Sequence, residues 1–132
     1  MTREEIREKT MQIIFQMDAA SEFDIDKLQT IEEHAKIIGK KQANAVFEAV
    51  KNNIEDIDDT ISSNLDKWSI DRIGKTDLAI LRNAVAEMKY IEEIPNRVSI
   101  NEAINLAKKY GDDKSYAFIN SVLSKVEKSL EA

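Results

Sequence analysis

Apolar residues recur along most of the chain at the three- and four-residue spacing of an amphipathic helix. In the segment VSINEAINLAKKYG, residues 98–111, the positions i, i+3, i+4 and i+7 are held by Ile100, Ala103, Ile104 and Ala107. The same period continues with few interruptions from the first residues to the last. The pattern therefore predicts an all-α fold of about seven short helices, joined by links of about two to eight residues.

The ends of the apolar stripes give approximate helix boundaries. Helices are expected over residues 3–19, from 24 or 26 to 38, 43–52, 54–67, 76–90, 98–110 and from 112 or 113 to 130. The third and fourth share one stripe, but Asn52 and Asn53 are poor helix formers and good caps, which favours a break there. A coiled coil over residues 43–65 is the alternative, for which the stripe is short.

Several residues carry signals of helix ends. Ser99 and Glu102 have the spacing of a capping box at the start of the sixth helix. Gly111 is expected to end that helix in the left-handed conformation, and Gly39 to close the second. Thr76 is predicted to be the N-cap of the fifth helix.

Composition supports one helical domain over residues 1–132. Only 3 Gly and 1 Pro are present, which leaves little material for β-turns, while 42% of residues are hydrophobic and 33% are charged. No apolar run approaches the roughly 20 residues needed to cross a bilayer. The opening MTREEIREKT lacks the apolar core of a signal peptide. We therefore expect a cytoplasmic protein with no membrane association.

Residues that could carry catalysis or bind a metal are scarce. The chain has no cysteine and a single histidine, His34, which is predicted to be an ordinary, partly exposed surface residue. The glycine-rich phosphate loops, the nucleophile elbow and the HExxH zinc sequence are all absent. Asp56, Asp58 and Asp59 are expected to form a solvated acidic face, because residues two apart do not face each other on a helix. No catalytic residue, metal site or cofactor is predicted.

The net charge of −6 is unevenly distributed. Residues 1–66 hold 8 basic and 15 acidic side chains, a net charge of −7, whereas residues 67–132 hold 11 and 10, a net charge of +1. An acidic chain repels phosphate at long range. If it binds nucleic acid, it is expected to do so through a local patch or beside a basic partner.

One group of residues has the chemistry of such a patch. Aromatic faces stack on unpaired bases, and Arg or Lys side chains hold phosphates. Candidate aromatics are Phe15, Tyr110 and Phe118, with Asn120 nearby and Arg3, Arg7 and Lys9 at the N-terminus. The alternative is that Phe15 and Phe118 are core residues.

The second half of the chain carries an ordered set of short segments. They are WSIDRI at 68–73, DLAILR at 77–82, AVAE at 84–87, IP at 94–95, VSINEAINLAK at 98–108, YG at 110–111 and SYAFINSVL at 115–123. With these segments the chain resembles the NusB family of bacterial transcription antitermination factors. RE at 7–8 and MQIIF at 11–15 extend the likeness, while residues 20–66 match only in helical pattern.

The resemblance implies a fold and a role. The fold is two small helical bundles packed together, with helices at about 3–67 and about 76–130, and without enzymatic activity. Proteins of this family pair with NusE, a small-subunit ribosomal protein, and bind the single-stranded boxA element of nascent RNA. The complex joins elongating RNA polymerase and suppresses termination, notably in ribosomal RNA operons. Some members form homodimers, and the sequence leaves this open.

The resemblance also assigns residues. RNA contacts are expected at Arg3, Arg7, Gln12, Phe15, Tyr110, Phe118 and Asn120, to which the charge of Lys114 is added. Asn120 could serve the fold instead. Asp77 and Arg82 are expected to face NusE, although Arg82 could equally form an internal ion pair.

Three departures from the family pattern bear on RNA binding. Glu4 and Glu5 dilute the basic N-terminus, Phe15 stands where Tyr is common, and Ser121 stands where Gly is usual. A scaffold that binds only protein is therefore the competing hypothesis. RNA methyltransferases also carry such domains, but 132 residues leave no room for a catalytic domain.

Overall fold

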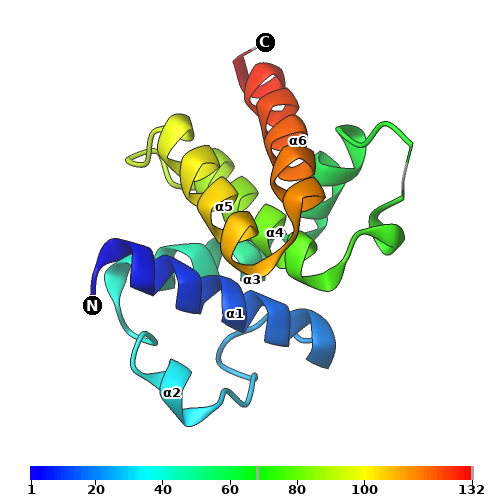
Figure 1. Ribbon diagram of the computed structural model, residues 1–132. Coiled ribbons are helices and arrows are strands. Elements are labelled where there is room, and N and C mark those ends of the chain that lie inside the picture. Colours follow the sequence, from blue (N-terminus) through cyan, green and yellow to red (C-terminus); the bar gives the residue numbers. More distant parts are fainter. Residues whose placement is uncertain (68, 132) are drawn as a thin grey trace.

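The computed structural model describes residues 1–67 and 69–131, all of them in helices, turns or irregular segments. Trp68, the first residue of the WSIDRI segment, and Ala132 lie outside the described residues. The elements are α1 (Arg3–Ala20), α2 (Glu32–Ala35), α3 (Lys41–Ser63), the short 3₁₀ helix η1 (Ile70–Arg72), α4 (Lys75–Tyr90), α5 (Asn96–Tyr110) and α6 (Asp113–Glu131) (Figure 1). The predicted all-α class is confirmed, with six α-helices in the described residues instead of about seven.

The difference in number comes from α3. Its residues were expected to form two helices, but they form one helix that is kinked at Asn53, where φ is −136° and ψ is 23°. The kink lies at the predicted break. Buried residues continue on both sides of it, from Val50 to Ile57 and Ile61, so packing on the core holds the two halves in one element.

The second predicted helix is largely wrong. Residues 25–27 form a turn, residues 28–31 are irregular, and only Glu32–Ala35 is helical. The Asp24 carboxylate accepts a hydrogen bond from the Asp26 backbone amide at 3.0 Å, and the Asp24 carbonyl accepts one from Lys27 at 3.0 Å. A short acidic side chain that bonds the nearby backbone competes with the helix, and this turn diverts the chain. Gly39 closes the segment with φ of 100°, a conformation that favours glycine.

Helix α4 is the central element of the fold. Every residue from Leu78 to Met88 is buried, as expected for a helix that is surrounded on all sides. It contacts α1 and α3 on one side and α5 and α6 on the other (Figure 1). The start of α4 therefore lies where the two groups of helices meet.

The predicted helix-end signals are mostly wrong in detail. Helix α5 begins after Pro95, and the Ser99 hydroxyl donates to Glu87 Oε1 at 2.8 Å instead of capping the helix. The capping box occurs at the start of α1, between Thr2 and Glu5. Thr76 is the second residue of α4, whose N-cap is Gly74.

Gly111 is required for a different reason from the one predicted. Its φ is −109°, which is not left-handed. A Cβ placed on Gly111 would lie 2.5 Å from Ser115 Cβ and 2.9 Å from the Ala107 carbonyl oxygen. The glycine therefore permits the close approach of α5 to the first turn of α6.

Candidate nucleic-acid interface

Helix α1 presents a polar and aromatic face beside the core. Arg3 is exposed at the first helical residue, Gln12 is half-buried, and Phe15 is 39% exposed. Of the two interpretations of Phe15, the structure supports the exposed one, since the buried stripe of α1 runs through Ile13, Ile14 and other residues.

Phe15 borders a cavity of about 360 Å³, which we call the Phe15 groove. Its walls come from α1, from the α2 segment, from the first turn of α4 and from the end of α5. The lining residues are Met11, Gln12, Phe15, Gln16, Glu33, His34, Thr76 and Tyr110. Residues far apart in the sequence therefore form one open surface.

His34 is buried at one wall of this groove, which contradicts the expected partly exposed position. It is 4% exposed, and its two ring nitrogens are hydrogen-bonded to α1. Nδ1 lies 3.1 Å from Gln16 Nε2, and Nε2 lies 2.9 Å from Gln12 Oε1. Burial lowers the pKa of His34, and Lys9 acts in the same direction, while the nearby Glu33 carboxylate opposes the shift.

A hydrogen-bonded chain continues from Gln12 across the groove. Gln12 Nε2 donates to the Tyr110 hydroxyl at 2.8 Å, and that hydroxyl donates to Glu8 Oε1 at 2.7 Å. Lys109 also pairs with Glu8. Burial alone would raise the pKa of Glu8, but the bonds from Lys109 and Tyr110 hold it below its ordinary value. Sequence reasoning did not identify Glu8, although its position one turn before Gln12 was a signal.

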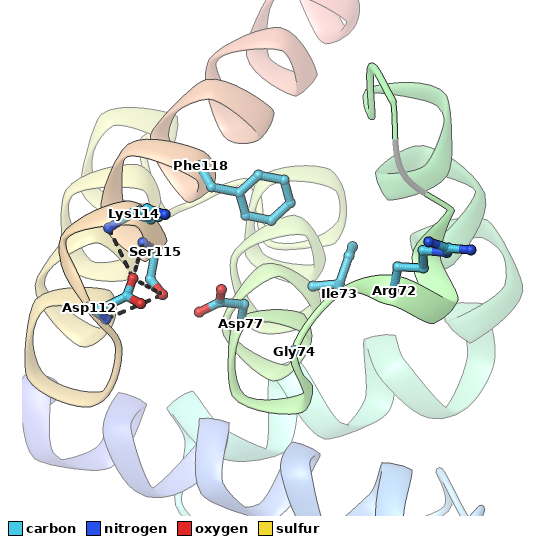
Figure 2. Close-up of a pocket in the computed structure, with 8 residues that line it drawn as sticks. All are labelled: Arg72, Ile73, Gly74, Asp77, Asp112, Lys114, Ser115 and Phe118. Carbon is cyan, nitrogen blue, oxygen red and sulfur yellow. Dashed lines mark hydrogen bonds between the residues drawn. The ribbon is translucent and has the colours of Figure 1, made fainter.

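A second cavity, of about 290 Å³, lies between the starts of α4 and α6, and we call it the Phe118 hollow (Figure 2). Its lining residues are Arg72, Ile73, Gly74, Asp77, Asp112, Lys114, Ser115 and Phe118. Asp112 Oδ1 accepts the backbone amides of Lys114 and Ser115, each at 2.9 Å, and so caps α6. This cap fixes the turn that carries Lys114.

Phe118 and Asp77 point into the hollow from opposite sides (Figure 2). Phe118 is half-buried and packs on the core, so it is both a core residue and a wall of the cavity. Asp77 is half-buried as well. Burial raises the pKa of Asp77, a hydrogen bond from Ser115 opposes this, and the charge of Asp112 adds to the rise.

The two cavities adjoin across the start of α4. Thr76 lines the Phe15 groove and its neighbour Asp77 lines the Phe118 hollow. Tyr110 and Asp112 are divided in the same way at the turn between α5 and α6. The structure thus places Gln12, Phe15 and Tyr110 at the Phe15 groove and Lys114 and Phe118 at the Phe118 hollow, two cavities lined by sequence neighbours.

Other predicted residues lie elsewhere. Asn120 is exposed on α6, accepts a hydrogen bond from Ser124 at 3.4 Å, and lines neither cavity. Arg7 is 7% exposed, and its Nε and Nη2 donate to the Glu87 carboxylate at 2.8 and 3.2 Å. Its guanidinium is thus directed into the interior, between α1 and α4.

Arg82 is also buried. It is 6% exposed and donates two hydrogen bonds of 2.9 Å to the Asp58 carboxylate. Its Nη1 lies 3.5 Å from Asp18 Oδ1, and its guanidinium carbon lies 4.9 Å from the centre of the Phe23 ring. The structure therefore supports an internal ion pair. The expected solvated acidic face is corrected in part: Asp56 and Asp59 are exposed, but Asp58 is half-buried on Arg82 and Asp56 pairs with Lys89.

Two negative findings concern the described residues. None of the helices within 1–67 and 69–131 is both long and apolar enough to span a membrane. The same residues contain no group of three or more His, Asp or Glu side chains that could hold a metal ion.

Comparison with known proteins gives a consistent family assignment. The NusB family model matches residues 4–128. A relative from Listeria monocytogenes serotype 4a, "Transcription antitermination protein NusB", is 43% identical over 126 residues, which cover 96% of both chains.

Two solved structures share the fold. T. maritima NusB has a TM-score of 0.79 at 32% identity and covers 97% of this chain and 92% of its own. A structure of antitermination factors NusB and NusE in complex with dsRNA has a TM-score of 0.73 at 24% identity, over 98% of this chain and 99% of that one. The resemblance found in the sequence is confirmed, and the chain belongs to the NusB family.

Proposed function

We propose that the chain is an RNA-binding transcription antitermination factor that pairs with NusE to bind boxA-type single-stranded RNA and suppress termination, notably in ribosomal RNA operons. The observation that carries the proposal is the surface formed by the Phe15 groove and the Phe118 hollow, with an aromatic wall in each cavity. It is supported by the antitermination role named for the relatives and by the NusB structure solved with NusE and RNA.

The proposed contacts are stacking and phosphate binding. Phe15 and Phe118 stack on unpaired bases, a contact worth about 1–3 kcal/mol per base. Arg3 and Lys114 neutralise phosphates, and Gln12 and Tyr110 offer polar groups between the two aromatic walls. Asn120, two residues beyond Phe118, stays a predicted contact at the margin. Arg7 supports the surface from inside, because its charge is paired with Glu87.

NusE is proposed to meet the chain at the start of α4, on the side of the Phe118 hollow that carries Asp77, while Phe118 on α6 faces RNA. The Asp77 carboxylate opens into that cavity and can accept hydrogen bonds from a basic residue. Arg82 contributes indirectly, by holding α4 to α3. The protein would act by binding rather than catalysis, in the cytoplasm and beside elongating RNA polymerase. A homodimer stays a prediction that sedimentation in the absence of partners can test.

Titration of labelled boxA-like RNA, with and without NusE, tests this function. We expect weak binding by the chain alone and a marked gain with NusE. Phe15→Leu and Phe118→Leu should each weaken RNA binding while NusE binding is retained, because leucine keeps apolar contacts and removes the stacking face. Tyr116→Leu is the matched control, since Tyr116 is an exposed aromatic on α6 that lines neither cavity.

A scaffold that binds only protein predicts another result. In that case NusE would still bind, and both phenylalanine substitutions would leave the RNA affinity of the ternary complex unchanged. A wild-type chain whose RNA affinity does not rise with NusE would contradict the cooperative mechanism.

A further inference from the structure

The row of hydrogen bonds in the Phe15 groove runs from Gln16 to Glu8, and Glu8 decides which group donates at each step. Glu8 is an ionised carboxylate and can only accept hydrogen bonds. The Tyr110 hydroxyl, 2.7 Å from Glu8, must therefore donate its proton to it. Its oxygen is then left to accept from Gln12, so Gln12 must present its Nε2 to Tyr110 and its Oε1 to the other side.

The same order of donors and acceptors determines which ring nitrogen of His34 carries the hydrogen. Gln12 Oε1 lies 2.9 Å from His34 Nε2, which must carry the hydrogen in order to donate. The other nitrogen of the neutral ring, Nδ1, then accepts from Gln16 Nε2 at 3.1 Å. Each donor along the chain from Gln16 to Glu8 meets one acceptor.

The two ends of this row of hydrogen bonds differ in how well they are paired. Gln16 Oε1 is buried and has no hydrogen-bond partner among the described residues. Leaving a buried polar atom unpaired is unfavourable. The unpaired oxygen is at the Gln16 end, whereas the Glu8 carboxylate at the other end accepts from Tyr110 and pairs with Lys109, so the direction is set from the Glu8 end.

We propose that His34 is a positioning residue of the RNA surface: its Nε2 hydrogen holds the Oε1 end of the Gln12 amide, whose Nε2 end is oriented by Glu8 through the Tyr110 hydroxyl. This inference rests on the proposed RNA-binding function. Without this donor the Gln12 amide is held only by its Nε2 contact with Tyr110, and the polar groups between the two aromatic walls are less firmly fixed. An ordered donor and acceptor pattern favours binding because less conformational freedom is lost when the ligand arrives.

The surroundings keep His34 in the required form. Glu33 on α2 and Lys9 on α1 are the charged groups that act on it, and Tyr110 on α5 reaches it through Gln12. A second proton would enter at Nδ1, opposite Gln16, and Gln16 could then turn its unpaired Oε1 toward the ring. The Nε2 donor remains in both states, so the Gln12 orientation does not depend on the charge of His34.

RNA binding with NusE present tests the proposal through a matched pair of variants. His34→Gln places an amide donor near the position of Nε2, whereas His34→Leu fills similar space without a donor. We expect His34→Leu to weaken RNA binding about three- to tenfold, the range for one lost hydrogen bond, and His34→Gln to remain within about twofold of wild type. NusE affinity and thermal melting control for loss of the fold.

A double-mutant cycle separates positioning from a general structural effect. If His34 acts through Gln12, His34→Leu should change RNA affinity no further in a Gln12→Ala background. Additive losses would overturn the proposal, as would a folded His34→Leu protein that binds RNA like wild type. If wild type itself binds no RNA with NusE, the proposed function fails instead.

A spectroscopic measurement tests the direction without RNA. His34 is the single histidine of the chain, so its ring nitrogens can be identified directly in ¹⁵N NMR spectra. Near neutral pH we expect Nε2 protonated and Nδ1 unprotonated. The opposite tautomer would leave Nε2 without a hydrogen to donate to Gln12, and it would overturn the proposal whether or not the protein binds RNA.

Discussion

Replacing Arg7 by methionine separates a structural role from an RNA contact. The substitution keeps an apolar stem of similar length and removes the guanidinium. In the structure this group donates to both oxygens of Glu87 at 2.8 and 3.2 Å, and Glu102 lies 3.9 Å away. Arg7→Met therefore removes the main partner of a carboxylate whose residue is 2% exposed.

The expected loss of stability is large. After the substitution the Glu87 carboxylate retains the Ser99 hydroxyl at 2.8 Å as its neighbour. Breaking a buried ion pair by removing one partner costs about 3–5 kcal/mol, because the remaining charge is left desolvated and uncompensated. The double variant with Glu87→Leu removes both charges and should recover most of this loss, since an apolar pair of similar volume is often as stable.

Urea unfolding followed by circular dichroism measures these free energies. Lys125→Met is the control, because Lys125 pairs with Asp66 at the surface, where ion pairs contribute little to stability. If Arg7→Met lowers the free energy of unfolding no more than the control but abolishes RNA binding, then Arg7 contacts RNA directly. A double variant less stable than Arg7→Met alone would also refute the buried-pair reasoning.

Three further predictions concern the stability of the protein and the salt dependence of its RNA binding. Gly111→Ala should lower the free energy of unfolding by about 1–3 kcal/mol in urea, because its Cβ would clash with Ser115. Burial lowers the pKa of His34 from 6.5 in the folded protein, so the unfolded chain binds more protons at a pH between the lowered value and 6.5. The free energy of unfolding should therefore fall as the pH drops through this interval, and it should fall less in His34→Gln. Lys114→Gln should make the dependence of log Kd on log salt shallower by about 0.7 for single-stranded RNA, whereas Lys128→Gln, at the far end of α6, should leave it unchanged.

Apolar periodicity was sufficient to predict the helices that have a continuous buried stripe. Helices α1, α4, α5 and α6 lie close to their expected ranges because their side chains pack on one core. The helix predicted within residues 24–39 is largely absent, because the turn at Asp24 depends on local hydrogen bonds that the spacing of apolar residues does not reveal.

The burial of charged residues depends on partners distant in the sequence. Arg7 and Glu87 are 80 positions apart, so no local pattern pairs them. A signal was nevertheless present. Arg7 stands on the stripe of Met11 and Ile14 at i, i+4 and i+7, and Glu87 follows Ile80 and Ala84 in the same spacing. Opposite charges on the apolar stripes of two predicted helices indicate a buried pair.

His34 could not be placed from sequence for a related reason. The four-residue helix that carries it has little stability of its own, so its position depends on contacts with α1. Those contacts are hydrogen bonds to Gln12 and Gln16, whose spacing of four places both on one face of α1. The spacing predicts that Gln12 and Gln16 share a face of α1, but it does not predict which residue packs against that face.

The internal pairing of Arg7 changes how RNA binding must be driven. Of the three cations expected to contact RNA, Arg7 is buried, which leaves Arg3 and Lys114 for phosphates. Two neutralised phosphates on a single strand give a salt slope of only about −1.4, and the chain carries a net charge of −6. Electrostatic attraction by this chain alone is therefore weak, so the proposed RNA binding would rely on stacking on Phe15 and Phe118 and on cations supplied by NusE.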